Sequence, residues 1–285
     1  FAITELEASE DWFALTSVKP TDAEGGFTPV TLSQPAAAPS LEGGYTVYYT
    51  ATGGEASTTV PTETGSYLVT VAITAEGYVN ETLTLGYYTI PGENQVVISF
   101  ITYGGPAIAP IMGTVNSSIE EGVWPGTPTY DGYEFGGWYK DAALHNKLET
   151  APTIIPSENA TYYASWIRVD YTITYEDLYG ATNDNPDTYH VETPTFTLNA
   201  PSLPGYLFKG WKAEGAITAS PTVTIEKGTT GNKIYTAVWE MITYTITYPY
   251  DYDKVGGNRT SYTVEDTDDG TISLTSPAER EGYTF

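Results

Sequence analysis

An internal repeat constrains the fold of this chain more than any other feature of its sequence. The segment GYEFGGWYKD, which begins at Gly132, returns as GYLFKGWKAE at Gly205, 73 residues later. The segments YYASW and YTAVW end in Trp166 and Trp239, and these tryptophans are again 73 residues apart. The same spacing separates the two copies of YTITY. Several landmarks that keep one period indicate a tandem array of small modules.

This period divides the chain into four segments. Residues 1–93 lie outside the period, 94–168 form a first repeat, 169–240 a second, and 241–285 an incomplete third. A third motif, GYTF, begins 77 residues after the second, which predicts a short insertion within the loop 251–260. The third segment lacks counterparts of Trp211 and Trp239. We therefore expect it to be the least ordered or most rearranged part.

The composition predicts a mainly β fold (β-rich α+β) in which any helix is short. The chain has 25 tyrosines, 28 glycines and 19 prolines, which is typical of strands interrupted by turns. Residues 45–52, 66–74 and 83–90 alternate as strands do, and the proline-rich stretch 33–40 is expected to be a loop. Residues 3–15 fit a helical turn or the start of a strand equally well.

Charge and residue usage exclude several classes of protein. Eleven Lys and Arg stand against 36 Asp and Glu, a formal net charge of −25, which argues against nucleic-acid binding and docking on anionic lipid. There is no cysteine, so disulfides, thiolate metal sites and cysteine nucleophiles are excluded. No apolar run is long enough for a membrane helix, so we expect no membrane insertion within this chain. Because it starts at Phe1, we expect it to be a piece of a longer protein.

The repeated motif also indicates a family. GYEFGGWYKD, with VVISFITYGG before it and YYASW after it, resembles the Listeria–Bacteroides repeat, the internalin-type B repeat. The resemblance covers residues 94–240 and part of 241–285. It implies β-grasp-like modules strung along a bacterial surface protein as an elongated tandem array. The second repeat reads GWKAEG where the family has GWY and an acidic residue, so we expect its loop after Trp211 to differ.

Residues 1–93 resemble another family more loosely. YTVYYTATGG, PTETGSYLVTV at 61–71 and GYYTI at 86–90 are similar to MBG-type modules, small β-rich domains found beside such repeats. Both resemblances imply export and a cell-surface, adhesin-like setting. Neither implies catalysis, and neither supplies a set of binding residues.

The aromatic side chains of the motif have two interpretations. They could form a platform for stacking a sugar, or they could form the small core of each repeat. We favour the core for Trp138 and Trp211, because every copy must solve the same packing problem and a small domain depends on each large side chain. Trp124, in GVWPG, has no counterpart in the second repeat. It is a better candidate for an exposed ring, although an anchor of its own loop is the interpretation that we favour.

The polar residues give weaker indications of a functional site than the aromatic residues do. Acidic residues gather in the loops at 251–253 and 265–269, where clustered carboxylates could bind calcium, but the spacing of a calcium loop is absent and a solvated turn is favoured. His145 and His190 occupy different positions of their repeats and are expected to be exposed in loops. No pattern marks a catalytic triad, a carboxylate pair or a phosphate loop.

These observations lead to one hypothesis and two alternatives. We expect a non-enzymatic extracellular segment of a bacterial surface protein that spaces or presents binding domains, with no catalytic, cofactor-binding or metal-binding residues. Its expected partners are the neighbouring repeats of the full-length protein and, in addition, unidentified host glycans or proteins. The first alternative is an adhesin module that binds a glycan or host protein itself. The second is an accessory region of a secreted polysaccharide-degrading enzyme.

Overall fold

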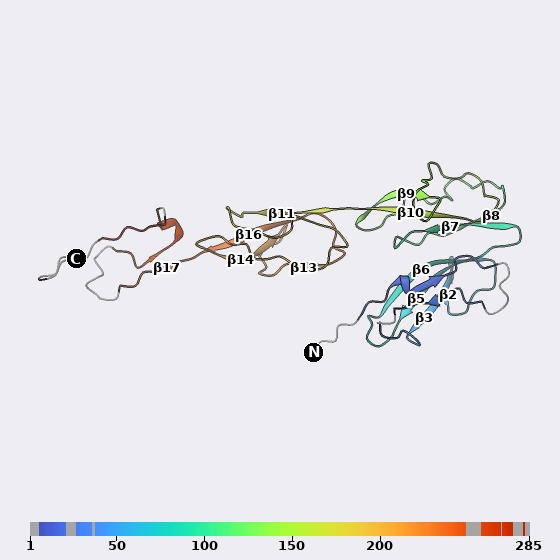
Figure 1. Cartoon of the computed structure of the whole chain (residues 1–285), viewed down its shortest axis with the longest axis horizontal. Helices are drawn as coiled ribbons and strands as arrows, with labels where there is room; N and C mark the ends of the chain where they lie inside the picture. The colour runs from blue at the N-terminus through green and yellow to red at the C-terminus, as the bar shows by residue number, and fades with distance from the viewer. Residues whose placement is uncertain are drawn as a thin grey trace. The chain divides into compact units, whose positions relative to one another are not determined.

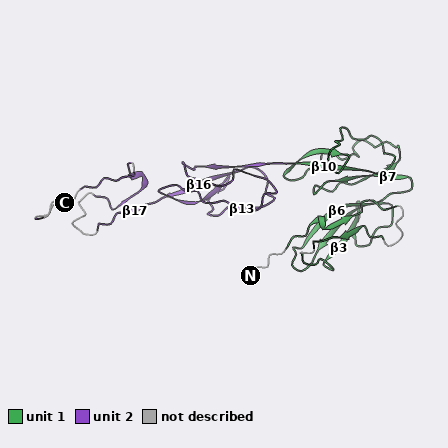
Figure 2. Cartoon of the chain, viewed as in Figure 1, with its two compact units in different colours: residues 1–167 green, residues 168–285 purple. Residues whose placement is uncertain are grey.

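The protein is almost entirely β-structure. The computed structural model describes residues 6–20, 27–35, 38–248, 258–268, 270–275 and 282, and all statements below refer to these. They contain many strands in small separate sheets and only short 3-10 turns, which confirms the predicted mainly β fold. The chain divides into two compact units, residues 1–167 and 168–285 (Figure 2).

The first part of unit 1 is a β-module built on one antiparallel sheet (Figure 1). The sheet has the order β4-β3-β5-β6, and a separate pair, β1-β2, accompanies it. The predicted strands at 45–52, 66–74 and 83–90 are confirmed as β3, β5 and β6. The ambiguous residues 3–15 contain both alternatives, a 3-10 turn and then a strand. The elements are η1 (Glu10–Trp12), β1 (Phe13–Leu15), β2 (Val30–Leu32), β3 (Tyr45–Ala51), β4 (Ala56–Ser57), β5 (Gly65–Ile73) and β6 (Glu81–Ile90).

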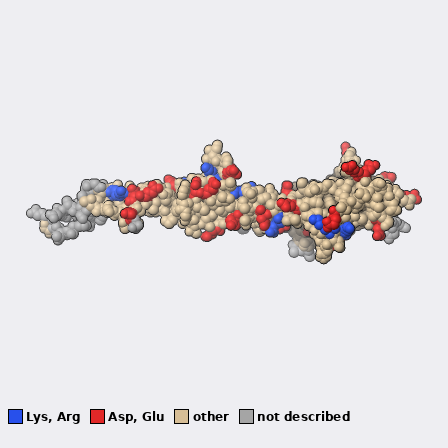
Figure 3. Space-filling model, turned by 90° about the horizontal axis from the view of Figure 1, so that it is seen from above, with Lys and Arg blue, Asp and Glu red and all other residues tan. Residues whose placement is uncertain are grey.

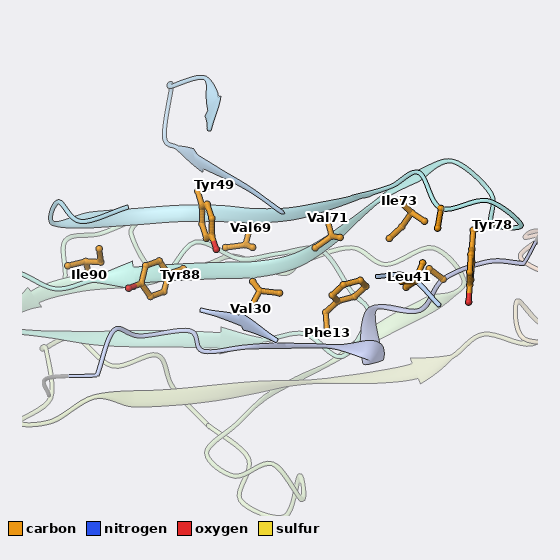
Figure 4. Packing of buried hydrophobic residues seen from close by; sticks show 12 residues of the cluster. Phe13, Val30, Leu41, Tyr49, Val69, Val71, Ile73, Tyr78, Tyr88 and Ile90 are labelled. Carbon is orange, nitrogen blue, oxygen red and sulfur yellow. The ribbon is translucent and has the colours of Figure 1, made fainter. Parts of the chain in front are cut away.

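The core of this module follows from the alternation of β5. Val69, Val71 and Ile73 are all at most 1% exposed, and their side chains point from one face of the sheet toward Phe13 and Val30 (Figure 4). Successive side chains of a strand point to opposite faces, so the residues between these three face away from the core. This hydrophobic cluster is separate from the clusters of the repeats that follow.

Each of the two repeats has its own four-stranded sheet, and the two sheets have the same topology. In each, the first strand pairs in parallel with the last and antiparallel with the second, giving the orders β8-β7-β10-β9 and β12-β11-β16-β14. A further short pair, β13-β15, lies in the second repeat. The strands of the first repeat are β7 (Gln95–Ile101), β8 (Ile111–Thr114), β9 (Tyr133–Tyr139) and β10 (Ala160–Arg168). Those of the second are β11 (Tyr171–Glu176), β12 (Thr188–Tyr189), β13 (Phe196–Thr197), β14 (Tyr206–Ala213), β15 (Thr224–Ile225) and β16 (Lys233–Met241).

The repeated aromatic motif is a strand with a bulge. In a regular strand, residues three apart face opposite sides, yet the rings of Phe208 and Trp211 are 5.1 Å apart. The register of β14 against β16 shifts between Phe208 and Gly210, and Gly210 has a φ of +142°. An extra residue in one strand changes which face the next side chain points to. The bulge therefore turns the phenylalanine and the tryptophan into the same core.

The third segment begins as the second repeat does. Its elements are β17 (Tyr244–Thr245), β18 (Ser261–Tyr262) and the 3-10 turn η3 (Val264–Asp266). Tyr171 pairs with Tyr189 in the second repeat, and Tyr244 pairs with Tyr262 in the third segment. The two hairpins thus span the same number of residues. The predicted insertion at 251–260 is therefore wrong, because an insertion there would have displaced the pairing.

A second contact of the hairpin agrees with this correction. The Tyr248 hydroxyl donates to the carbonyl of Arg259, as the Tyr175 hydroxyl donates to the carbonyl of Pro186 in the second repeat. The additional residues before the third GYxF motif must therefore follow β18. The prediction that the third segment is the least ordered part falls largely on residues outside the described ones. Of its described residues, none is buried.

Candidate functional site

The tryptophans of the motif belong to the core. Trp138 is 6% exposed and Trp211 is 1% exposed, which confirms the core interpretation and removes the sugar platform at these two positions. Trp124 is half-buried, with its ring 5.2 Å from that of Phe100 and 5.1 Å from that of Tyr162, both edge-on. It is an anchor of its own loop, as favoured from the sequence.

The two histidines differ in their environment. His145 is exposed in the loop after β9, as predicted. The prediction is wrong for His190, which is half-buried with a buried Nδ1. His190 begins a tight turn after β12, in which its amide donates to Thr193 Oγ1 and its carbonyl accepts from the Thr193 amide. The turn draws the ring in, whereas an open loop would have left it in solvent.

The acidic loops of the third segment are described only in part. Asp251, Asp253 and Asp269 lie outside the described residues. Asp266 accepts from the amide and hydroxyl of Thr263 and pairs with Arg259 at 2.8 Å. These contacts hold the pKa of Asp266 below its usual value. Within the described part of the chain, no group of three or more side chains is arranged to hold a metal ion.

One hollow lies in unit 1, beside the β-module. It has a volume of about 250 Å³, and its lining includes Glu10, Phe13 and Leu15 from one side and Phe100 and Tyr103 from the other. Burial raises the pKa of the Glu10 carboxyl above its usual value. Apart from this carboxyl, the named side chains are apolar or aromatic, and nothing in the lining indicates a particular ligand.

A second hollow, in unit 2, has a more distinctive lining. This cleft, of about 400 Å³, is lined by three aromatic side chains, one leucine and one carboxylate: Tyr179, Tyr206, Trp239, Leu203 and Glu265. We refer to it as the Trp239 cleft. The Trp239 indole is fixed from behind, because its Nε1 donates to the carbonyl of Asp177 at 2.9 Å and its ring lies edge-on to Phe208 at 5.4 Å.

The wall of the cleft is completed by the segment that follows the second repeat. The Tyr206 hydroxyl donates to Glu265 Oε1 at 2.9 Å, and this hydrogen bond raises the pKa of the tyrosine. Val264 packs against the turn at Gly205, where a Cβ would lie 2.5 Å from the valine Cβ. Because Gly205 also has a φ of +81°, only glycine allows this close approach without strain. The close approach places the carboxylate of Glu265 at the cleft.

The turn that carries Tyr179 differs from its counterpart in the first repeat by one residue. Both turns have a tyrosine and a glycine at positive φ, Tyr103-Gly104 and Tyr179-Gly180. In the first repeat, the Trp166 indole donates to Thr102, the residue directly before the tyrosine. In the second repeat, Trp239 donates to Asp177, which is one residue further back and itself has a φ of +55°. One additional residue therefore precedes the second turn.

This difference changes the position of the tyrosine. The ring of Tyr103 stacks on Tyr163 at 6.1 Å, and its hydroxyl donates to the carbonyl of Ala142. Tyr179 is 73% exposed, and it lines the cleft beside Trp239. In the first repeat, the space beside the closing tryptophan, Trp166, is occupied by a further tyrosine. Tyr130 stacks on Tyr133 at 4.6 Å and lies 5.4 Å from the Trp166 ring.

The corresponding position in the second repeat is Leu203. Both residues begin the same turn, in which the amide of the aromatic strand's first tyrosine donates to their carbonyl. Leucine lacks the ring that covers the tryptophan in the first repeat, so this exchange opens the cleft. The sequence reasoning missed the cleft because it weighed the residues that repeat. Two departures from the period would have indicated it, the leucine at 203 and the additional residue near 177.

Comparison with known proteins finds the same two repeats that the fold shows. Residues 97–165 and 171–238 each match the model of the Listeria-Bacteroides repeat domain. The chain carries two copies of this repeat. The matched residues run through the parallel pair of strands and the aromatic strand of each sheet. The similarity of residues 1–93 to MBG-type modules stays a prediction.

Three curated relatives extend the comparison. Two proteins of Evansella cellulosilytica, described as "Putative membrane protein" and "Putative Gly-rich membrane protein", are 29% and 28% identical over 195 and 198 residues. These alignments cover 67% of this chain and 27% and 21% of the relatives. Internalin H of Listeria monocytogenes is 36% identical over 98 residues, 34% of this chain and 16% of the relative. The chain thus spans less than a third of each relative's length.

Within the described residues, no helix has the length and apolar character that crossing a bilayer requires.

Proposed function

We propose that this chain is a non-enzymatic, extracellular segment of a bacterial surface protein that spaces or presents binding domains. The similarity to internalin H and to the two Evansella proteins supports this, because each of these chains is much longer than the shared region. Residues 1–93, 94–168, 169–240 and 241–285 would be successive modules, the first of MBG type. We assign no residue a catalytic or cofactor-binding role.

The observation that carries this function is the way in which one small core is rebuilt along the chain. Each repeat closes its sheet around its own aromatic cluster, so each can fold without a large shared interior. Only two residues separate β10 from β11, and two separate β16 from β17. Short connections of this kind limit the freedom between neighbouring modules, unlike flexible glycine-rich linkers.

Specific contacts between successive modules are visible inside unit 2. The Ile242 amide donates to the carbonyl of Gly205 at 2.9 Å, and Val264 packs on the same glycine. The Tyr206–Glu265 hydrogen bond lies beside them. A following segment that docks on a defined surface of the preceding repeat suits a spacer, because it fixes the direction in which the chain continues.

A module replacement in the full-length protein tests this function. Residues 169–240 would be deleted, or replaced by an unrelated folded β-domain of equal length, and the proteins would be displayed on cells. Deletion should reduce the access of antibodies to a tag placed beyond the array, and the replacement should restore it. The variants would be matched for surface expression by a second tag placed before Phe1.

Adhesion measured on the same cells distinguishes the alternative. If the replacement loses adhesion to host cells or glycans as fully as the deletion does, the repeats bind a ligand themselves and the spacer function is wrong. A protease added to intact cells checks the extracellular location, since an internal segment would be protected.

A further inference from the structure

We propose that the Trp239 cleft binds a compact organic cation, a methylated ammonium group of the kind found in choline. In this cleft one tryptophan and two tyrosines meet a carboxylate. Its size of about 400 Å³ lies within the range of about 300–1,000 Å³ that small-molecule sites occupy. This role is independent of the spacer function.

The aromatic lining matches the chemistry of such a cation. The face of an aromatic ring carries partial negative charge, which attracts a cation that has little hydration to lose. Tryptophan provides the strongest attraction of this kind and tyrosine the next, and the cleft has one tryptophan and two tyrosines. Tyr179 is held at the cleft by a turn, and Trp239 by its hydrogen bond to Asp177, so little ordering is required when a ligand binds.

The charge of the lining favours a positively charged ligand. Among the described residues that line the cleft, Glu265 is the one carboxylate, and none is a lysine or an arginine. The whole chain has a formal net charge of −25, and Figure 3 shows acidic side chains spread over the visible face with few basic ones. An acidic protein raises the local concentration of cations and repels anions. A phosphate or sulfate would therefore be disfavoured.

The carboxylate of Glu265 is held where it can contact a bound cation. Its Oε1 accepts from the Tyr206 hydroxyl at 2.9 Å, which fixes the carboxylate at the rim of the cleft. The side chain is exposed to solvent. It comes from the third segment, whereas the aromatic side chains come from the second repeat. The site is therefore complete only where a following segment docks on the repeat.

The first repeat provides an internal comparison. Tyr130 covers the Trp166 ring at 5.4 Å, and Tyr103 is turned away onto Tyr163. A Cβ on Gly105 would lie 2.5 Å from the Trp166 ring, so the chain itself presses on this indole. The second repeat has Ala181 after the equivalent turn, and Leu203 in place of the tyrosine. The two repeats thus share a half-buried tryptophan, which packs near Tyr130 in the first repeat and lines the cleft in the second.

The test is a titration of the full chain followed by nuclear magnetic resonance. The probe is choline chloride, and the signal is the indole N–H of Trp239, assigned through the variant Trp239→Phe. We expect a saturable shift with a dissociation constant on the order of 1 mM, since a few cation–π contacts and one charge provide limited affinity. The neutral compound 3,3-dimethylbutan-1-ol has the shape of choline without its charge, and it should bind about tenfold more weakly.

Two substitutions examine the two parts of the site. Leu203→Tyr should close the cleft in the manner of the first repeat, and Glu265→Gln removes the charge while it keeps an acceptor for the Tyr206 hydroxyl. Each should weaken choline binding about tenfold. Glu214→Gln, an equal change of charge outside the cleft, and Tyr103→Asn, in the equivalent turn of the first repeat, should change it less than about twofold.

Each other outcome would overturn the cation site. Equal binding of 3,3-dimethylbutan-1-ol and choline would show that the cleft responds to shape alone. Tighter binding of a methyl glucoside at the same indole signal would identify a sugar site. The absence of a saturable shift, or full binding by Leu203→Tyr with its fold intact by amide chemical shifts, would show that the cleft holds no such ligand.

Discussion

The two repeats use the same internal connections to hold their sheets. In both, an asparagine before the last strand accepts a hydrogen bond from an amide of the first strand, Asn159 from Val97 at 2.8 Å and Asn232 from Thr172 at 3.0 Å. In both, the closing tryptophan donates its indole N–H to a carbonyl after the first strand. These bonds join the beginning and the end of each repeat, which lie far apart in sequence.

The repeats differ in what surrounds the shared frame. In the second, the Trp211 indole donates to the carbonyl of Asn199, whereas the buried Nε1 of Trp138 has no hydrogen-bond partner among the described residues. The first repeat adds Trp124 to its core, and the second has no residue like it. The comparison teaches that the frame is set by the repeated residues, while single exchanges decide how well each indole is satisfied and how much of it is exposed.

Substitution of the two core tryptophans should have the largest effect. Trp211→Phe should destabilise the second repeat by about 2–3 kcal/mol, because it loses packing and leaves the Asn199 carbonyl without its donor. Trp138→Phe should cost about 1 kcal/mol less, because it also removes a buried donor that has no partner. Hydrogen exchange of the β14–β16 and β9–β10 amides would measure the local free energies of opening. Equal costs would show that the two indoles have equivalent environments.

The asparagine connections should show the next largest effect. Asn159→Ala should destabilise the first repeat by about 1–3 kcal/mol, because the Val97 amide that it satisfies is buried and would lose its partner. Asn232→Ala should cost about 0.5–1 kcal/mol, since Thr172 is exposed and water can replace the side chain. Urea unfolding of each variant checks this. Asn→Asp at each position, which keeps an acceptor, should retain most of the stability.

The loops after the aromatic strands should differ in their response to acid. Asp141 accepts from the amides of His145 and Asn146, and these bonds hold its pKa below the usual 3.8. Because the folded pKa is lowered, the contribution to stability is present above about pH 3.8 and is lost as the pH falls through the lower folded value. Exchange of the two amides should accelerate in this range.

The second repeat has a different residue at the position of Asp141. Glu214 replaces Asp141 there, and the backbone amide of Glu214 donates to the carbonyl of Ile234. The predicted difference of this loop is therefore confirmed. The variant Asp141→Asn keeps an acceptor and should abolish the acid dependence. Acceleration that persists in this variant would attribute it to another group.

The smallest effect is expected at a surface ion pair that only the second repeat has. Lys209 Nζ lies 2.7 Å from Glu240 Oε2, and their side chains are 48% and 60% exposed. Water and salt screen such a pair, so Lys209→Gln should change the free energy of unfolding by less than about 0.5 kcal/mol, and less at high salt. Glycine and isoleucine occupy these positions in the first repeat. A larger cost would mean that the pair distinguishes the stabilities of the two repeats.

Much of the fold could be predicted from the sequence, because the pattern of the strands is local. Alternation identified β3, β5 and β6, and the exact period identified the aromatic core of Trp138 and Trp211. The position of the insertion in the third segment could not be found in this way. Spacing between motifs gives only the sum of the residues between them, whereas the pairing of Tyr244 with Tyr262 shows on which side of β18 the additional ones lie.

The sequence alone determined that the chain repeats a small β-module and that each copy must bury the same rings, because a pattern that recurs at a constant spacing reflects a shared packing problem. Tertiary structure decided that the closing tryptophan of the second repeat lines a cleft. That depends on three segments distant in sequence: the turn at Tyr179, the residue at 203, and the docking of Glu265. Their meeting depends on one additional residue near 177 and on the close approach that Gly205 permits, and the sequence does not show that these segments come together in space.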